Sequence, residues 1–111
     1  MQHMVEGVIV VNTETIAGKV ITKNLGVVGG STVRAKHLGR DIFAGLKNVV
    51  GGELTAYTEL LDESRNQAIA RMIADATARG ANAVVNVRFA TSAVTAGASE
   101  LFAYGTAVVV E

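Results

Sequence analysis

Apolar and polar positions repeat with two different periods along this chain, and each period predicts a different kind of element. Between residues 55 and 79, apolar side chains recur every three or four positions, the spacing of one face of an α-helix. Thr55 or Thr58 is expected to cap the start of this helix, and Gly80 to end it. The apolar face of this long amphipathic helix comprises Tyr57, Leu60, Leu61, Ala68, Ile69, Met72, Ile73 and Ala76.

A shorter run with the same period covers residues 39–50. Its apolar stripe consists of Ile42, Phe43, Leu46, Val49 and Val50. Gly51 and Gly52 follow directly and predict the left-handed stop that ends many helices. We therefore expect one short helix before the long one.

Strand patterns lie on both sides of the predicted helices. Residues 7–11 and 16–28 are rich in Val, Ile and Thr and are broken by turn-forming residues, which predicts two or three short strands. Residues 84–91 alternate, and residues 101–110 form another strand after the turn-like residues 95–99. Because no helix fits between these last two strands, they are expected to pair as an antiparallel hairpin.

The two faces of this hairpin are both apolar. In the first strand, one face is predicted to carry Val85, Val87 and Phe89, and the other Val84, Asn86 and Arg88. In the second, a flat face carries Leu101, Ala103, Gly105, Ala107 and Val109, and a bulkier face Phe102, Tyr104, Thr106, Val108 and Val110. A strand that is apolar on both sides is covered on both sides. One helix layer covers one side, so the short helix or a neighbouring subunit is expected to cover the other.

The length and composition agree with this interpretation. The 111 residues suit a single domain, 1–111, and 50% of them are hydrophobic, more than so small a core readily buries. We expect an α+β fold in which an antiparallel sheet packs with one long and one short helix and further copies of the chain complete the structure.

Charge and cysteine content exclude several classes of function. Ten basic and ten acidic residues balance, so no overall field attracts nucleic acid or an anionic membrane. No cysteine is present, which excludes disulfides, thiolate chemistry and cysteine-based metal sites. The first residues do not resemble a signal peptide, and no apolar run is long enough to span a membrane. A cytoplasmic location is expected.

The charges are segregated along the chain. Residues 19–47 carry six basic side chains against one acidic, for a net +5, and residues 53–63 carry four acidic side chains and no basic one. Opposite patches on one chain suit head-to-tail contacts between copies, in which the basic region of one meets the acidic helix of the next. Nucleic-acid binding by the basic region is disfavoured because no stacking aromatic residues lie among its basic residues.

Several motifs occur together in an order that resembles the YbjQ-like family of small prokaryotic proteins. The resemblance covers the chain from about Gly26 onward. The matching segments are Gly26–Val28, Arg40–Leu46, Val50–Gly52, Tyr57, Gly80–Val85 and Gly105–Val108. It implies a dodecin-like α+β subunit, a five-membered ring, and the label of heavy-metal binding that the family carries. This chain departs from the family pattern at Ser31, Ala35, Glu53 and Asn86, where the family has Glu, Gly, Arg and Gly, respectively.

A metal site is the first candidate chemistry. His3 and His37 are the only imidazoles, and they lack chelating spacing, so a complete site within one subunit is not expected. In a ring, one donor from each copy could converge on a divalent ion, with His37 beside Asp41, or Glu53 beside Glu59, as the candidate donors. The preferred interpretation remains that His37 is an exposed loop residue and that both glutamates are charges at the start of a helix.

A second candidate site is built from ligand or interface residues. Asp41 can cap the short helix, and Arg40 can hold a carboxylate from a ligand or from a neighbouring subunit. Asn48 and the Gly51–Gly52 turn can bring backbone amides close to an anion, although a simple helix stop is the preferred interpretation. Tyr57, one of the residues shared with the family, completes this set.

No signature of nucleophilic or nucleotide-dependent catalysis is present in the sequence. The expected function is therefore non-enzymatic: an oligomeric protein that binds a metal ion or a small ligand between subunits. Two alternatives stay open, a purely structural or protein-interaction module and an enzyme that depends on carboxylates.

Overall fold

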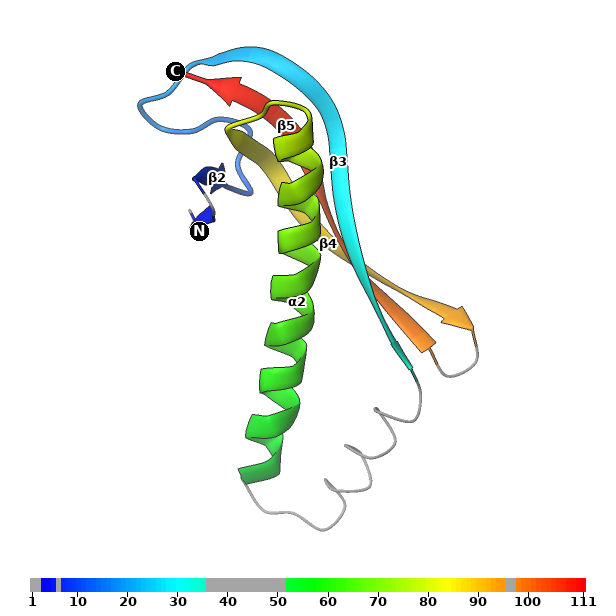
Figure 1. Cartoon of the computed structure of the whole chain (residues 1–111). Coiled ribbons are helices and arrows are strands. Elements are labelled where there is room, and N and C mark those ends of the chain that lie inside the picture. Colours follow the sequence, from blue (N-terminus) through cyan, green and yellow to red (C-terminus); the bar gives the residue numbers. More distant parts are fainter. Residues whose placement is uncertain (1–2, 6, 36–51, 96–97) are drawn as a thin grey trace.

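The computed structural model describes residues 3–5, 7–35, 52–95 and 98–111. Figure 1 shows one long helix lying against a curved, elongated sheet. The described elements are β1 (His3–Val5), β2 (Val8–Val10), β3 (Ile21–Ala35), α2 (Gly52–Ala78), β4 (Ala83–Thr95) and β5 (Ala98–Val110). The predicted short helix at 39–50 lies outside the described residues.

The described strands form one sheet in the order β1-β2-β4-β5-β3. The predicted hairpin is confirmed, because β4 and β5 pair in antiparallel fashion, and β3 pairs with β5 in the same way. The sheet is nevertheless mixed and not antiparallel throughout, since β2 runs parallel to β4. The chain can make that parallel pair because β3, α2 and their connections lie between β2 and β4 and return the chain to the same end of the sheet.

β3 corrects the prediction that the residues between 16 and 28 form only short strands. It runs unbroken through the turn-forming residues 23–26, which produce irregular pairing with β5 and no chain reversal. The Asn24 side chain accepts a hydrogen bond from the Gly26 amide (3.0 Å), and Gly26 takes a left-handed conformation with φ of 94°. The turn-forming residues therefore make β3 irregular without ending it, because β5 pairs with the strand on both sides of the irregularity.

α2 confirms the long helix, and its end follows the prediction. Gly80 has φ of 85°, and the amides of Gly80 and Ala81 donate to the carbonyls of Thr77 and Ala76. This is the Schellman arrangement, in which a left-handed glycine lets the last carbonyls find donors. Of the predicted apolar face, Ala68, Met72, Ile73 and Ala76 are completely buried.

The start of α2 differs from the prediction. The helix begins at Gly52, so Thr55 and Thr58 lie inside it and neither stands at its first residue. Gly52 therefore belongs to the long helix and is not the stop of a preceding one, while Gly51 lies outside the described residues. A glycine just before a helical run can end the preceding helix or begin the following one. The sequence alone did not distinguish these two roles for Gly52.

α2 packs closely on β3 because the strand carries a glycine at the contact. A Cβ atom on Gly30 would lie 2.4 Å from the Met72 backbone nitrogen and 2.6 Å from the Ala68 carbonyl oxygen. Val28 on β3 and Ala103 and Ala107 on β5 belong to the same buried cluster. The flat, small-residue face predicted for β5 is thus the face against which the helix packs.

A bulge in β4 corrects the predicted faces of that strand. The register with β5 shifts between Val85 and Arg88, and Asn86 has a positive φ of 55°. As a result Val87 shares the helix-side cluster with Val84, whereas Val85 belongs to the cluster on the opposite side. Phe89, paired with Ala103, also lies on the helix side and not with Val85. Strict alternation fails here because the bulge adds one residue to the strand.

The face of the sheet away from α2 is partly covered by the N-terminal segment. Ile9, Val11 and Ile16 pack with Val85, Val108 and Val110 in a second buried cluster. The expectation that the short helix or another subunit must supply all of this cover is therefore wrong for this end of the sheet. No helix among the described residues is long and apolar enough to cross a membrane.

Candidate functional site

The predicted site residues that the structure describes all lie on the N-terminal half of α2. Glu59 is exposed, and Gly52, Glu53 and Tyr57 are placed on the helix without a description of their side chains. His37, Arg40, Asp41, Asn48 and Gly51 lie outside the described residues. The roles assigned to these positions therefore stay predictions.

The acidic face of α2 carries Glu59, Asp62 and Glu63. All three are exposed, and two of them have partners on the same helix. Asp62 pairs with Arg65 (2.9 Å), and the Gln67 side chain donates to Glu63 (3.4 Å). Within the described part of the chain, no three His, Asp or Glu side chains lie close enough together to hold a metal ion. The described residues of a single copy therefore do not form a metal site.

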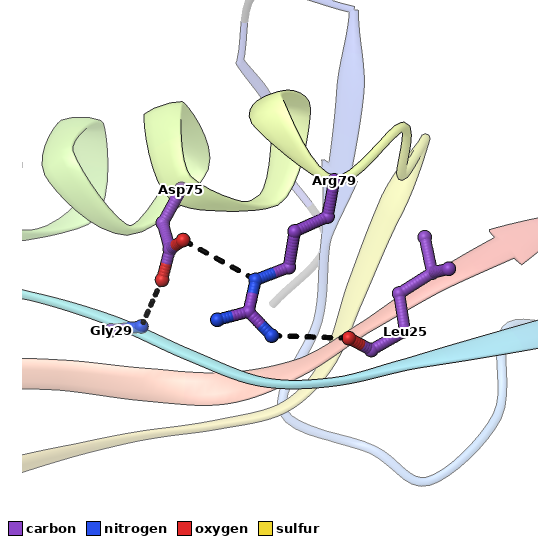
Figure 2. Close-up of polar contacts among 4 residues, drawn as sticks. All are labelled: Leu25, Gly29, Asp75 and Arg79. Carbon is purple, nitrogen blue, oxygen red and sulfur yellow. Dashed lines mark hydrogen bonds and ion pairs between the residues drawn. The ribbon is translucent and has the colours of Figure 1, made fainter.

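A row of charged side chains at the C-terminal half of α2 contacts the backbone of β3. Arg79 Nη1 donates to the Leu25 carbonyl (3.1 Å), and Asp75 Oδ2 accepts from the Gly29 amide (3.4 Å). Asp75 also accepts from Arg79 Nε at 3.3 Å (Figure 2). One turn earlier, Arg71 donates to the Ser31 carbonyl. We call Arg71, Asp75 and Arg79 the α2 row.

The α2 row was not recognised from the sequence as a functional feature. Its signal was the spacing of three charged residues at intervals of four, which places them on one helical face. The row joins the outer edge of β3, whose free amides and carbonyls would otherwise be open to water or to another strand. Its contacts to β3 are therefore those of edge protection.

The N-terminal segment leaves part of the sheet uncovered. On the face away from α2, Val27 and Val33 are 68% and 56% exposed. The rings of Phe102 and Tyr104 stack there with centroids 5.4 Å apart, and the Phe102 ring lies against Gly29. On the helix side, Phe89 is 47% exposed. Apolar residues thus remain accessible on both faces.

The overall dimensions agree with this incomplete cover. The radius of gyration is 16.6 Å, against about 13 Å for a compact domain of this length. The accessible surface is 6910 Å², against about 5,800 Å² for a folded monomer of this mass. The difference is of the order that one partner buries in a protein–protein interface of ordinary size.

Comparison with known proteins identifies a family that this chain matches. A model of the YbjQ_1 family, described as "Putative heavy-metal-binding", matches residues 8–111. The match begins well before Gly26, the position at which the motifs recognised in the sequence start.

Similar proteins occur in distant prokaryotes. A UPF0145 protein from Hahella chejuensis is 64% identical over 103 residues, which are 93% of this chain and 99% of the relative. A UPF0145 protein from Clostridioides difficile is 57% identical over 93% of this chain and 92% of its own length. Neither these names nor the family description indicates an enzymatic activity.

A crystal structure of a protein of unknown function from Pediococcus pentosaceus, assigned to the DUF74 family, has a similar fold. The TM-score is 0.63, and the alignment covers 96% of this chain and all of the other. At 14% sequence identity, this likeness concerns the fold alone.

Proposed function

Because this chain belongs to the YbjQ_1 family, described as "Putative heavy-metal-binding", we propose that it is a non-enzymatic, homo-oligomeric protein that holds a metal ion or small ligand where its subunits meet. The proposed assembly is a ring, and the family resemblance implies five members. Its ligand site would combine groups from neighbouring copies.

The observation that carries this proposal is the extended, partly bare sheet. Val27, Val33 and Phe89 are largely accessible in a chain whose surface exceeds that of a compact monomer by about a fifth. Exposed apolar groups gathered on an elongated surface favour association, since their removal from water stabilises the complex. Association of identical chains in a closed ring removes such surface from every copy equally.

The placement of the ligand between copies is supported by the distribution of donors. The described residues of one chain lack a group of three metal-binding side chains, so an ion bound through them needs donors from several chains. Glu59 is an exposed carboxylate that a ring would bring close to other copies, and His37 and Asp41 are the further donors predicted from the sequence. A borderline ion such as Zn²⁺ suits these oxygen and nitrogen donors.

The proposal is tested with the full chain by native mass spectrometry followed by thermal unfolding with Zn²⁺, Cu²⁺ or Ni²⁺. We expect a mass that is a multiple of the 11.5 kDa subunit. At about 100 times its dissociation constant, a bound ion should stabilise the folded state by about 2.7 kcal/mol and raise Tm. Glu59→Gln should reduce this rise, whereas Asp62→Asn, an exposed carboxylate already paired with Arg65, should leave it unchanged.

Two results would contradict separate parts of the proposal. A single-subunit mass at micromolar concentration would refute the oligomer. An oligomer whose Tm is the same with and without each of the three ions would refute metal binding and favour the alternative, a structural or interaction module.

A further inference from the structure

The sheet has two outer edges beside its long strands, and in the described part of the chain each is covered over only part of its length. Along β3, the outward-facing backbone groups of Leu25, Gly29 and Ser31 are bonded by the α2 row. Covering an edge with a helix is a common way to prevent another strand from adding to it. Along β3, the α2 row contacts backbone groups no further than Ser31.

The outer edge of β4 is covered only over its first residues. β2 pairs with Ala83 and Val84, and the following segment continues the cover, since the Val87 amide donates to the Val11 carbonyl (3.0 Å). Beyond Val87, no strand in the described part of the chain pairs with this edge. Backbone groups alternate in direction along a strand, so the amides of Phe89, Thr91 and Ala93 point outward as that of Val87 does.

The sequence of this bare edge lacks the usual protective features. Residues 89–99 contain no charged residue and no proline, and residues 89–93 are all exposed. Natural edge strands that stay unpaired commonly carry lysine or proline, which discourage the addition of another strand. An uncharged edge rich in Thr, Ala and aromatic or β-branched residues is instead suited to pairing.

The parts of the two edges that neither a described strand nor the α2 row covers lie on opposite sides of one three-stranded region. We call this region the distal sheet: residues 32–35 of β3, 88–95 of β4 and 98–102 of β5. It projects beyond the N-terminal strands, with β5 between the two outer strands (Figure 1). Two different bare edges on opposite sides of a sheet allow each copy to join the next in the same way, which is the geometry of a ring.

We infer that the distal sheets of neighbouring copies join edge to edge, with β4 from Phe89 to Thr95 of one copy pairing with β3 beyond Ser31 of the next. The partner is therefore a second copy of this chain, which supplies the unprotected edge that β4 needs. The inference rests on the proposed oligomer and adds the strands that form it. Joining the copies satisfies the outward amides and carbonyls and removes exposed surface at each junction.

The absence of cysteine allows a direct crosslinking test in the full chain. Val33 and Ala90 are exposed and lie on the same face of the sheet, paired within one copy with Glu100 and Phe102. The double variant Val33→Cys, Ala90→Cys should give a ladder of covalent multimers with a short thiol crosslinker. Each single variant should give none, because in a head-to-tail junction equivalent residues do not meet.

A proline substitution tests the main-chain contact independently. Thr91→Pro removes an outward amide, which a free edge tolerates but a paired edge does not. It should weaken assembly by roughly tenfold or more while the monomer keeps its circular dichroism spectrum. Thr91→Val keeps both the amide and the β-branched side chain, and should assemble like the wild type.

The outcomes separate this inference from the proposed function. An oligomeric wild type whose double-cysteine variant assembles but gives no ladder would overturn the inference alone, and so would dimers formed by Ala90→Cys alone, which would show β4 meeting β4. Normal assembly of Thr91→Pro would also overturn it. A wild type with the mass of one subunit would contradict the proposed oligomer, and this junction with it.

Discussion

Gly30 determines how closely α2 approaches the sheet. Its missing side chain lets the helix backbone at Ala68 and Met72 lie directly against β3. Because the clashing atoms would be backbone atoms, a side chain here cannot be accommodated by rotating a neighbour. The helix and strand would have to separate, which loosens the cluster that contains Val28 and Met72.

Gly30→Ala should therefore lower the free energy of unfolding by about 1–3 kcal/mol, as an overpacked core position does. Ser31→Ala, at the next position on the opposite face, is the matched control, because it keeps the carbonyl that accepts from Arg71. Its effect should stay within about 0.5 kcal/mol. Urea unfolding of both variants measures the difference in their free energy of unfolding. Equal midpoints for Gly30→Ala and Ser31→Ala would show that the close contact at Gly30 does not limit the stability of the fold.

Asn86 occupies a position where the resemblance to the YbjQ-like family implies glycine. The residue has a φ of 55° in the bulge of β4. Glycine adopts this left-handed conformation freely, and asparagine is among the few other residues that tolerate it. Asn86 is therefore compatible with the bulge, which places Val87 on the helix side.

At the level of elements, α2 and β3 are joined by more than apolar packing. The α2 row supplies donors and an acceptor to backbone groups on the side of β3 where no described strand pairs with it. Asp75 is central because its two oxygens contact different partners, the Gly29 amide and Arg79 (Figure 2). Its loss would leave that amide without its acceptor and Arg79 without its ion pair.

Asp75→Ala should destabilise the fold by about 1 kcal/mol and speed hydrogen exchange at the Gly29 amide. Asp62→Ala is the comparison: this residue also pairs with an arginine on α2, but it is 60% exposed, and in the described structure its bond is to that arginine. Its loss should cost less than about 0.5 kcal/mol. Hydrogen exchange with mass spectrometry reports both variants, and unchanged Gly29 exchange in Asp75→Ala would contradict the edge-protecting role.

At the scale of the molecule, the shape links stability to assembly. A chain that keeps apolar side chains such as Val27 accessible gains stability when another copy covers them. Folding and association are then coupled, because only the folded chain presents the surface that associates.

Tm should therefore rise with protein concentration, by several degrees for a roughly tenfold increase, as mass action requires for an oligomer. Differential scanning calorimetry over a range of concentrations measures this directly. Thr91→Pro, if it prevents assembly, should show a Tm that does not depend on concentration. A constant Tm for the wild type would indicate a subunit that is stable alone.

The sequence by itself determined the elements whose signals are local. The period of apolar residues placed α2, and Gly80 placed its end, because helical periodicity and a left-handed stop depend on neighbouring residues only. Alternation placed β4 and β5 and the small-residue face of β5. The candidate residues from His37 to Gly51 stay predictions.

Only the tertiary structure decided the features that depend on distant partners. Turn-forming residues at 23–26 became an irregularity inside β3 because β5 is long enough to hold the strand on both sides. The bulge at Asn86 reversed the expected faces of Val87 and Phe89, and β2 joined β4 in parallel. Which parts of the β3 and β4 edges are covered also required the fold, since it depends on which segments of the chain meet in space.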